Sequence, residues 1–148
     1  MEEKIKDMLP DIHRILTMDA PIQKVWDAVS TTEGLASWLM PNNFQLELGY
    51  EFTFQAKPMG NWDGVVRCKV MELDPPHKLG FTWHGNQMEL YVSFELNKME
   101  DEKTEFILIH SGWKAEQAMF REKMYEGWGH LTEGLQTKLG DQSDGYLS

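Results

Sequence analysis

Residues 88–96 read MELYVSFEL, and this run gives the clearest indication of the fold. Five apolar side chains, the first Met88 and the last Leu96, alternate with four more polar ones. A period of two is that of a β-strand with one face buried and the other in water. Strands of this kind are typical of antiparallel sheets covered on one side. We therefore expect a sheet whose apolar face needs a cover.

The same alternation recurs on both sides of this run. It predicts one strand near the start of the chain, over residues 12–19. It predicts further strands over residues 44–48, 52–56, 66–70, 79–83 and 106–110. The alternation fails at Glu72-Leu73, which indicates a β-bulge there.

Two short helices are predicted between the first and second of these strands. The first has one apolar face; Asp19 can cap it, and Pro21 suits its first turn. The second begins at a cap formed by Thr31 or Thr32 and ends before Pro41.

A long helix is predicted over residues 114–139. Gly140 is expected to end it in a left-handed conformation. One stripe of the helix carries the apolar side chains of Phe120, Met124, Trp128, Leu131, Leu135 and Leu139. This is the only predicted element long enough to cover the sheet, so the fold class is α+β, with a helix layer on a sheet layer.

Three glycines, Gly127, Gly129 and Gly134, interrupt that helical pattern. Each costs about 1 kcal/mol relative to alanine in a helix interior. One interpretation is a close approach of helix and sheet, or a bend in the helix. The other is that side-chain volume is missing beside Trp128 and Leu131, which leaves space between helix and sheet.

Length and charge restrict the classes of function. The 148 residues suit a single domain, with a core over about 12–139 and mobile ends at 1–10 and 141–148. The formal net charge of −10 opposes binding to nucleic acid or to an anionic membrane. No apolar run could span a membrane, and the charged start does not resemble an export signal. With one cysteine, Cys68, a cytoplasmic location is expected.

The sequence offers little for catalysis. The five histidines lack metal-ligand spacing, and neither a nucleophile elbow nor a phosphate-binding loop occurs, so we predict no catalytic residue, no metal and no cofactor. His110 shares the apolar face of its strand and is either a satisfied half-buried histidine or a polar anchor in a cavity. Arg14 and Glu72 are the other ionisable residues that could face inward, and we assign Glu72 no catalytic role.

Several motifs together resemble one known family. Residues 20–28 read APIQKVWDA, residues 38–41 read WLMP, residues 110–113 read HSGW, and Gly127-Trp128 lies in the predicted long helix. In this order they resemble the START-like, or SRPBCC, superfamily. Within it they resemble the bacterial branch named after the C-terminal domain of the heat-shock-protein-90 ATPase activator homologue. The resemblance implies a helix-grip fold, a curved antiparallel sheet wrapped around the C-terminal helix with a cavity between them.

The resemblance leaves several functions open, since such proteins include carriers of hydrophobic ligands, polyketide cyclases, stress-linked proteins and a co-chaperone domain. Few ionisable residues face inward, which favours binding of a lipid-like, polyketide-like or flavonoid-like molecule over a cyclase. A co-chaperone-like module is less favoured, because the resemblance covers one domain only. A protein partner is not indicated. The predicted cavity wall consists of Trp38, Met40, Phe54, Cys68, Phe81, Trp83, Leu90, Val92, Leu108, His110, Met124, Trp128 and Leu131.

Overall fold

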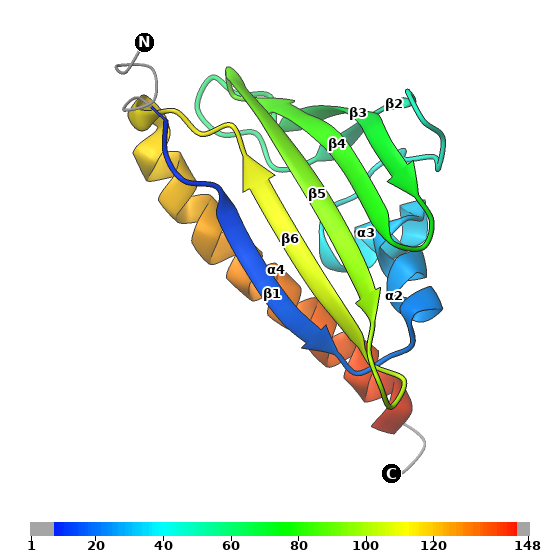
Figure 1. Cartoon of the computed structure of the whole chain (residues 1–148). Helices are drawn as coiled ribbons and strands as arrows, with labels where there is room; N and C mark the ends of the chain where they lie inside the picture. Colours follow the sequence, from blue (N-terminus) through cyan, green and yellow to red (C-terminus); the bar gives the residue numbers. More distant parts are fainter. Residues whose placement is uncertain (1–7, 145–148) are drawn as a thin grey trace.

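Strand β5 (Met88–Lys98), which contains the alternating run, pairs with β4 (Lys78–Gly85) on one side and β6 (Thr104–Ser111) on the other. The computed structural model describes the backbone of residues 8–144 and the side chains of residues 8–140 (Figure 1). Leu90, Val92, Phe94 and Leu96 of β5 are buried, as the alternation predicts.

The sheet has six strands, and each pair of adjacent strands runs antiparallel. Its order is β1-β6-β5-β4-β3-β2, so β1 (Ile12–Met18) lies at one edge and β2 (Glu51–Gln55) at the other. β3 (Val65–Asp74) changes register against β4 between Val70 and Glu72. This irregularity confirms the predicted bulge.

Helices α2 (Ile22–Val29) and α3 (Thr32–Trp38) follow β1. The hydroxyl oxygen of Thr31 accepts a hydrogen bond from the backbone N–H of Gly34 over 2.9 Å, so Thr31 is the cap of α3. The expected cap at Asp19 is wrong, because the N-cap position of α2 is Pro21 and no side chain caps it. The α2, α3 and α4 helices lie on one side of the sheet (Figure 1).

The long helix α4 (Ala118–Asp144) follows a short 3₁₀ turn, η1 (Ala115–Gln117). Its buried side chains start at Trp128 and continue with Thr132, Leu135 and Leu139. Phe120 was expected on the buried stripe, yet 46% of it is exposed, because the first turns of α4 extend past the part of the sheet that buries Trp128. Gly140 does not end the helix, which continues to Asp144.

The predicted strand over residues 44–48 is wrong. Only Asn42 forms a bridge, to Phe54, at the outer edge of β2. The amide groups of two asparagines replace ladder bonds: Asn42 Oδ1 accepts from the N–H of Phe44, and Asn43 Oδ1 accepts from that of Thr53. Asparagine side chains compete with sheet hydrogen bonds in this way, which leaves a loop. Leu48 is 63% exposed in it.

The expectations for the chain ends fall mainly outside the structure. Residues 1–7 and 145–148 lie outside the described residues. Within the described part, Met8 bridges to Lys114, and the N–H of Leu9 donates to the carbonyl of Trp113 over 2.9 Å. No helix in the part that the structure describes is long and apolar enough to span a bilayer.

Candidate functional site

The predicted wall residues come together on the inner face of the sheet and on the helices that face it. Ten of the thirteen are buried, whereas Met40, Met124 and Leu131 are only partly buried. Trp83 lies at the centre: its ring centroid is 5.5 Å from that of Phe54 and 5.8 Å from that of Trp128. Aromatic pairs at these distances stabilise a fold by more than the apolar area that they bury. The middle of the wall is therefore a packed aromatic cluster.

His110 is the polar group within this cluster. It is fully buried on β6, and three tryptophan rings surround it: Trp83, Trp113 and Trp128, with centroids 5.3, 4.9 and 5.8 Å away. The Nε1–H of Trp128 donates to its Nδ1 over 2.9 Å. Its Nε2 is buried without a hydrogen-bond partner among the described residues.

These contacts determine the protonation of His110. Burial lowers the pKa of its imidazole from 6.5 to about 3, so the ring is neutral at physiological pH. Because Nδ1 accepts from Trp128, the single proton of the neutral ring resides on Nε2. Nε2–H is thus a buried donor without an acceptor. A donor of this kind costs free energy when it is left unpaired.

Cys68 lies on the inner face of β3, and its thiol is unreactive. Burial raises the pKa of its thiol far above the ordinary value, so the nucleophilic thiolate is suppressed. Its Sγ lies 3.9 Å from the carbonyl oxygen of Val66, a weak contact within the same strand. Cys68 therefore acts as a small apolar wall residue.

The other two ionisable candidates lie on opposite faces of the sheet. Glu72 points away from the wall and accepts a hydrogen bond from the Tyr91 hydroxyl over 2.7 Å. This bond, with help from Lys78 at 3.3 Å, lowers the pKa of Glu72. Arg14 lies on the inner face of β1 beside Gly129, and its Nε is buried without a partner among the described groups. Of these two candidates, only Arg14 shares the inner face with His110.

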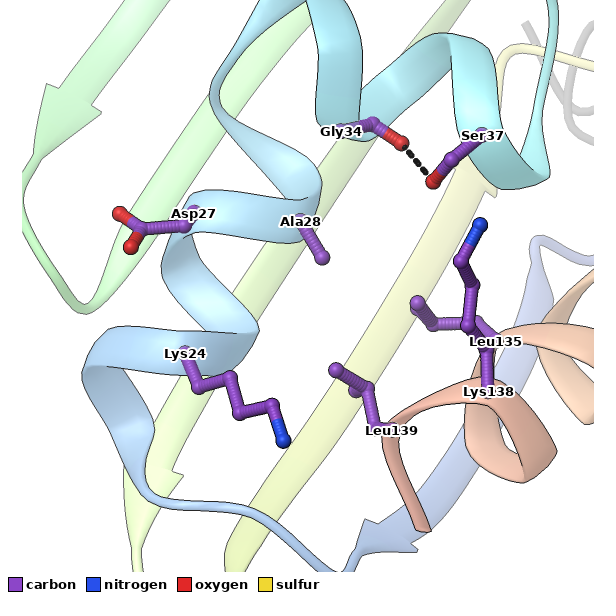
Figure 2. Close-up of a pocket in the computed structure, with 8 residues that line it drawn as sticks. All are labelled: Lys24, Asp27, Ala28, Gly34, Ser37, Leu135, Lys138 and Leu139. Carbon is purple, nitrogen blue, oxygen red and sulfur yellow. Dashed lines mark hydrogen bonds between the residues drawn. The ribbon is translucent and has the colours of Figure 1, made fainter. Parts of the chain in front are cut away.

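A pocket of about 230 Å³ lies elsewhere, between α2, α3 and the last turns of α4 (Figure 2). None of the thirteen predicted residues lines it. Its lining is Lys24, Asp27, Ala28, Gly34, Ser37, Leu135, Lys138 and Leu139. The alternation and the helical stripe identify inward faces, whereas this pocket is bounded largely by side chains on the flanks of helices. The sequence carried no signal for it.

Among the residues that the structure describes, no three histidine, cysteine or acidic side chains gather closely enough to hold an ion. Besides His110 and Arg14, the interior holds buried hydroxyl groups, such as those of Thr104 and Thr132, which donate to backbone carbonyl oxygens.

Comparisons with known proteins agree on the architecture. The family described as Activator of Hsp90 ATPase homolog 1-like protein matches residues 19–140. The solution structure of Bacillus halodurans protein BH1534 is 39% identical, covers 85% of this chain and 93% of its own, and gives a TM-score of 0.73. No curated protein gives a significant match.

Two more distant structures show the same fold. The Aha1 dimer from Colwellia psychrerythraea is 23% identical, with 88% of this chain and 96% of that chain covered and a TM-score of 0.73. DynU16, from the dynemicin biosynthetic locus, is 20% identical, with coverages of 88% and 47% and a TM-score of 0.73.

Proposed function

The chain belongs to the Activator of Hsp90 ATPase homolog 1-like family within the START-like superfamily, and from this premise we propose that it binds a small, largely apolar molecule. The ligand lies between the inner face of the sheet and α4. It is lipid-like or an aromatic molecule of the polyketide or flavonoid type, with a carbonyl or hydroxyl oxygen that pairs with His110.

The observation that carries this proposal is the unpaired Nε2–H of His110. A fully buried donor without a partner is uncommon in native proteins and calls for an explanation. The surrounding tryptophan rings offer the apolar contacts that ligand sites use, and sites of this kind combine an apolar wall with a few placed polar groups. A ligand oxygen at Nε2 would satisfy both features.

The state of His110 favours binding over acid–base catalysis. A general base needs a free lone pair and a pKa near the working pH. The Nδ1 lone pair of His110 is occupied by Trp128, Nε2 carries the proton, and the pKa is about 3. The suppressed thiolate of Cys68 offers no nucleophile. The cyclase alternative would thus need a base other than these two groups.

Access to the interior is supported at the first turns of α4. No side chain of residues 118–127 is buried, and Met124 and Leu131 are partly exposed. Gly127 lies between them on the helix, and a Cβ built on it would meet no atom within 4 Å. This part of the helix is thus the least buried side of the wall, and an apolar ligand that enters here must displace aromatic side chains packed around His110.

Two probes of nearly equal shape test the proposal from the ligand side. Methyl naphthyl ketone presents a carbonyl oxygen, and ethylnaphthalene presents a methylene in its place. We expect the ketone to bind the wild type roughly two- to twelvefold more tightly, the value of one neutral hydrogen bond. Chemical-shift titration gives both affinities and should place the largest shifts at His110 and Trp128. Equal affinities, or shifts confined to other surfaces, would refute His110 as the anchor.

A variant separates binding from turnover. His110→Leu has no side-chain donor, so it should remove the preference for the ketone and leave the affinity for ethylnaphthalene within about twofold. The exposed His84 on β4 supplies the matched control, His84→Leu, which should change neither value. If the wild type converts any ligand found in a wider screen, and His110→Leu slows that conversion by about 10²–10⁴-fold, the protein is an enzyme and the carrier function is wrong.

A further inference from the structure

The Nε–H of Arg14 is a second interior donor without a hydrogen-bond partner among the described residues, and we propose that Arg14 binds a carboxylate of the ligand. The ligand class is then an apolar monocarboxylic acid whose second oxygen function reaches His110. This inference rests on the proposed function, because it assigns the other end of the same ligand.

Arg14 and His110 share one layer of the interior. β1 and β6 pair with Ile12 opposite His110 and Arg14 opposite Leu108, so Arg14 and His110 are diagonal neighbours on the inner face. Backbone positions in this relation are about 7–8 Å apart. Consecutive residues of α4 face the two donors: Trp128 contacts His110, and Gly129 lies beside Arg14. A molecule that contacts both donors would thus lie in this layer between β1, β6 and α4.

The charge of Arg14 is poorly compensated. Only 24% of its side chain is exposed, and its Nε is buried without a hydrogen-bond partner in the described part of the chain. The ion-pair partner that the structure gives it is Glu133, whose Oε2 is 3.8 Å from a guanidinium nitrogen and whose side chain is 66% exposed. That distance is too long for a hydrogen bond, and exposed pairs contribute little. A partly buried cation with an unused N–H favours an anionic partner.

The shape of the guanidinium defines the anion. Nε and one Nη present two parallel N–H groups, which match the two oxygens of a carboxylate. Gly129 lies against this guanidinium: a Cβ built on it would make an ordinary contact, 3.9 Å from the guanidinium carbon, and a longer side chain would cover the group. A single guanidinium cannot neutralise a phosphate dianion, and the net charge of −10 repels one. A monocarboxylate is therefore the matching class.

The test extends the probe series by one member, naphthoic acid, whose carboxylate is nearly equal in shape to the methyl ketone. We expect wild-type protein at neutral pH and low salt to bind the acid roughly ten- to hundredfold more tightly than the ketone, because a charge-assisted pair replaces a neutral contact. Added salt should weaken binding of the acid but not of the ketone.

Variants of Arg14 and Glu133 assign the effect. Arg14→Gln should abolish the preference for the acid and leave ketone affinity within about twofold. Arg14→Lys should keep part of the preference for the acid, because lysine retains the charge but lacks the two parallel N–H groups of the guanidinium. Glu133→Gln should bind the acid as tightly as the wild type or more tightly, because a competing carboxylate is removed.

The outcomes distinguish the two proposals. If the ketone binds through His110 but the acid is no tighter, Arg14 has no ligand role and only this inference fails. If Arg14→Gln weakens both probes equally, Arg14 merely holds α4 against β1, which also refutes it. Amide spectra of each variant reveal loss of fold, and in that case the salt dependence of the wild type decides alone. If no probe binds, the proposed function fails, and this inference with it.

Discussion

The indole Nε1–H of Trp128 donates to Nδ1 of His110 over 2.9 Å, and this bond links the long helix to the last strand inside the core. Both residues are fully buried. The bond fixes the tautomer of the imidazole, so that its remaining N–H points at whatever lies beyond Nε2. A packing contact between helix and sheet therefore also sets the chemistry offered to a ligand.

Replacing Trp128 by phenylalanine tests this relationship. The ring stays aromatic, but Nδ1 of His110 loses its donor. An unsatisfied buried group costs about 1–3 kcal/mol, so we expect a loss of at least that size in the free energy of unfolding, measured in urea. The nitrogen resonances of the imidazole should show that the tautomer is no longer fixed.

Trp113 supplies the matched control. It is equally buried and also donates to His110, but to the backbone oxygen, over 3.1 Å. Trp113→Phe should destabilise the fold without changing the tautomer. If both variants leave the imidazole resonances unchanged, the Trp128–His110 bond does not control the tautomer.

Truncation of Trp128 to alanine should behave as a core mutation. The indole makes ring contacts with Trp38, Trp83 and His110 at centroid distances of 6.4, 5.8 and 5.8 Å. Removing a packed tryptophan costs about 3–5 kcal/mol, and we expect a value in this range by chemical denaturation. A loss below about 2 kcal/mol would instead indicate that the indole borders empty space.

Period-two alternation was enough to predict the inner face of the sheet. Phe94, Leu96, Phe106 and Leu108 are all fully buried, because a one-residue shift would expose every one of them. The alternation between Phe44 and Leu48 gave a wrong prediction of a strand, because a strand also needs a hydrogen-bonded partner strand along its length. Beyond β2 the backbone pairs with asparagine side chains instead, so Leu48 stays exposed.

The candidate site was predictable as a set of residues but not as a geometry. Inward orientation follows from alternation, and His110 is buried on the inner face as the alternation predicts. The partner of its Nδ1 lies 18 residues away on another element, and no local pattern encodes that meeting. The pocket beside Lys24 and Lys138 is bounded by flanks of three helices, whose relative placement depends on tertiary packing.

The glycines of α4 can now be tested individually. A Cβ on Gly127 or Gly134 would meet no atom within 4 Å, so close approach to the sheet does not explain either glycine. We expect Gly134→Ala and Gly127→Ala each to raise the free energy of unfolding by about 0.5–1 kcal/mol, through helix propensity. Thermal or urea unfolding measures this. Destabilisation by either alanine would show that an unseen contact requires the glycine.

Gly34 of α3 provides the contrast. A Cβ there would overlap the backbone oxygen of Asp27 and lie 2.8 Å from the Cα of Ala28, so helix α2 itself blocks it. Gly34→Ala should therefore lower stability, by about 1–3 kcal/mol for overpacking, despite the gain in helix propensity. The opposite signs of the Gly34 and Gly134 variants would show that space, not propensity, decides between them.

The pH dependence of stability provides the last test of His110. Its folded-state pKa of about 3 lies below the 6.5 of an ordinary histidine, so below pH 6.5 the unfolded chain takes up a proton that the folded chain refuses. The resulting loss in the free energy of unfolding is absent at neutral pH. It grows as the pH falls below 6.5, by about 1.4 kcal/mol per pH unit, and reaches roughly 2 kcal/mol at pH 5. The rings around the imidazole are uncharged tryptophans, and the cationic Arg14, its diagonal neighbour on the inner face, also disfavours protonation, so the sign is unchanged. Urea unfolding of wild type and His110→Gln at pH 7 and pH 5 isolates the effect, since the shared carboxylates cancel in the difference.

His84→Gln, at an exposed site, should keep the wild-type dependence of stability on pH. Equal pH dependence in wild type and His110→Gln would mean that the imidazole takes up a proton in the folded protein, which would return His110 to the candidates for an acid or base.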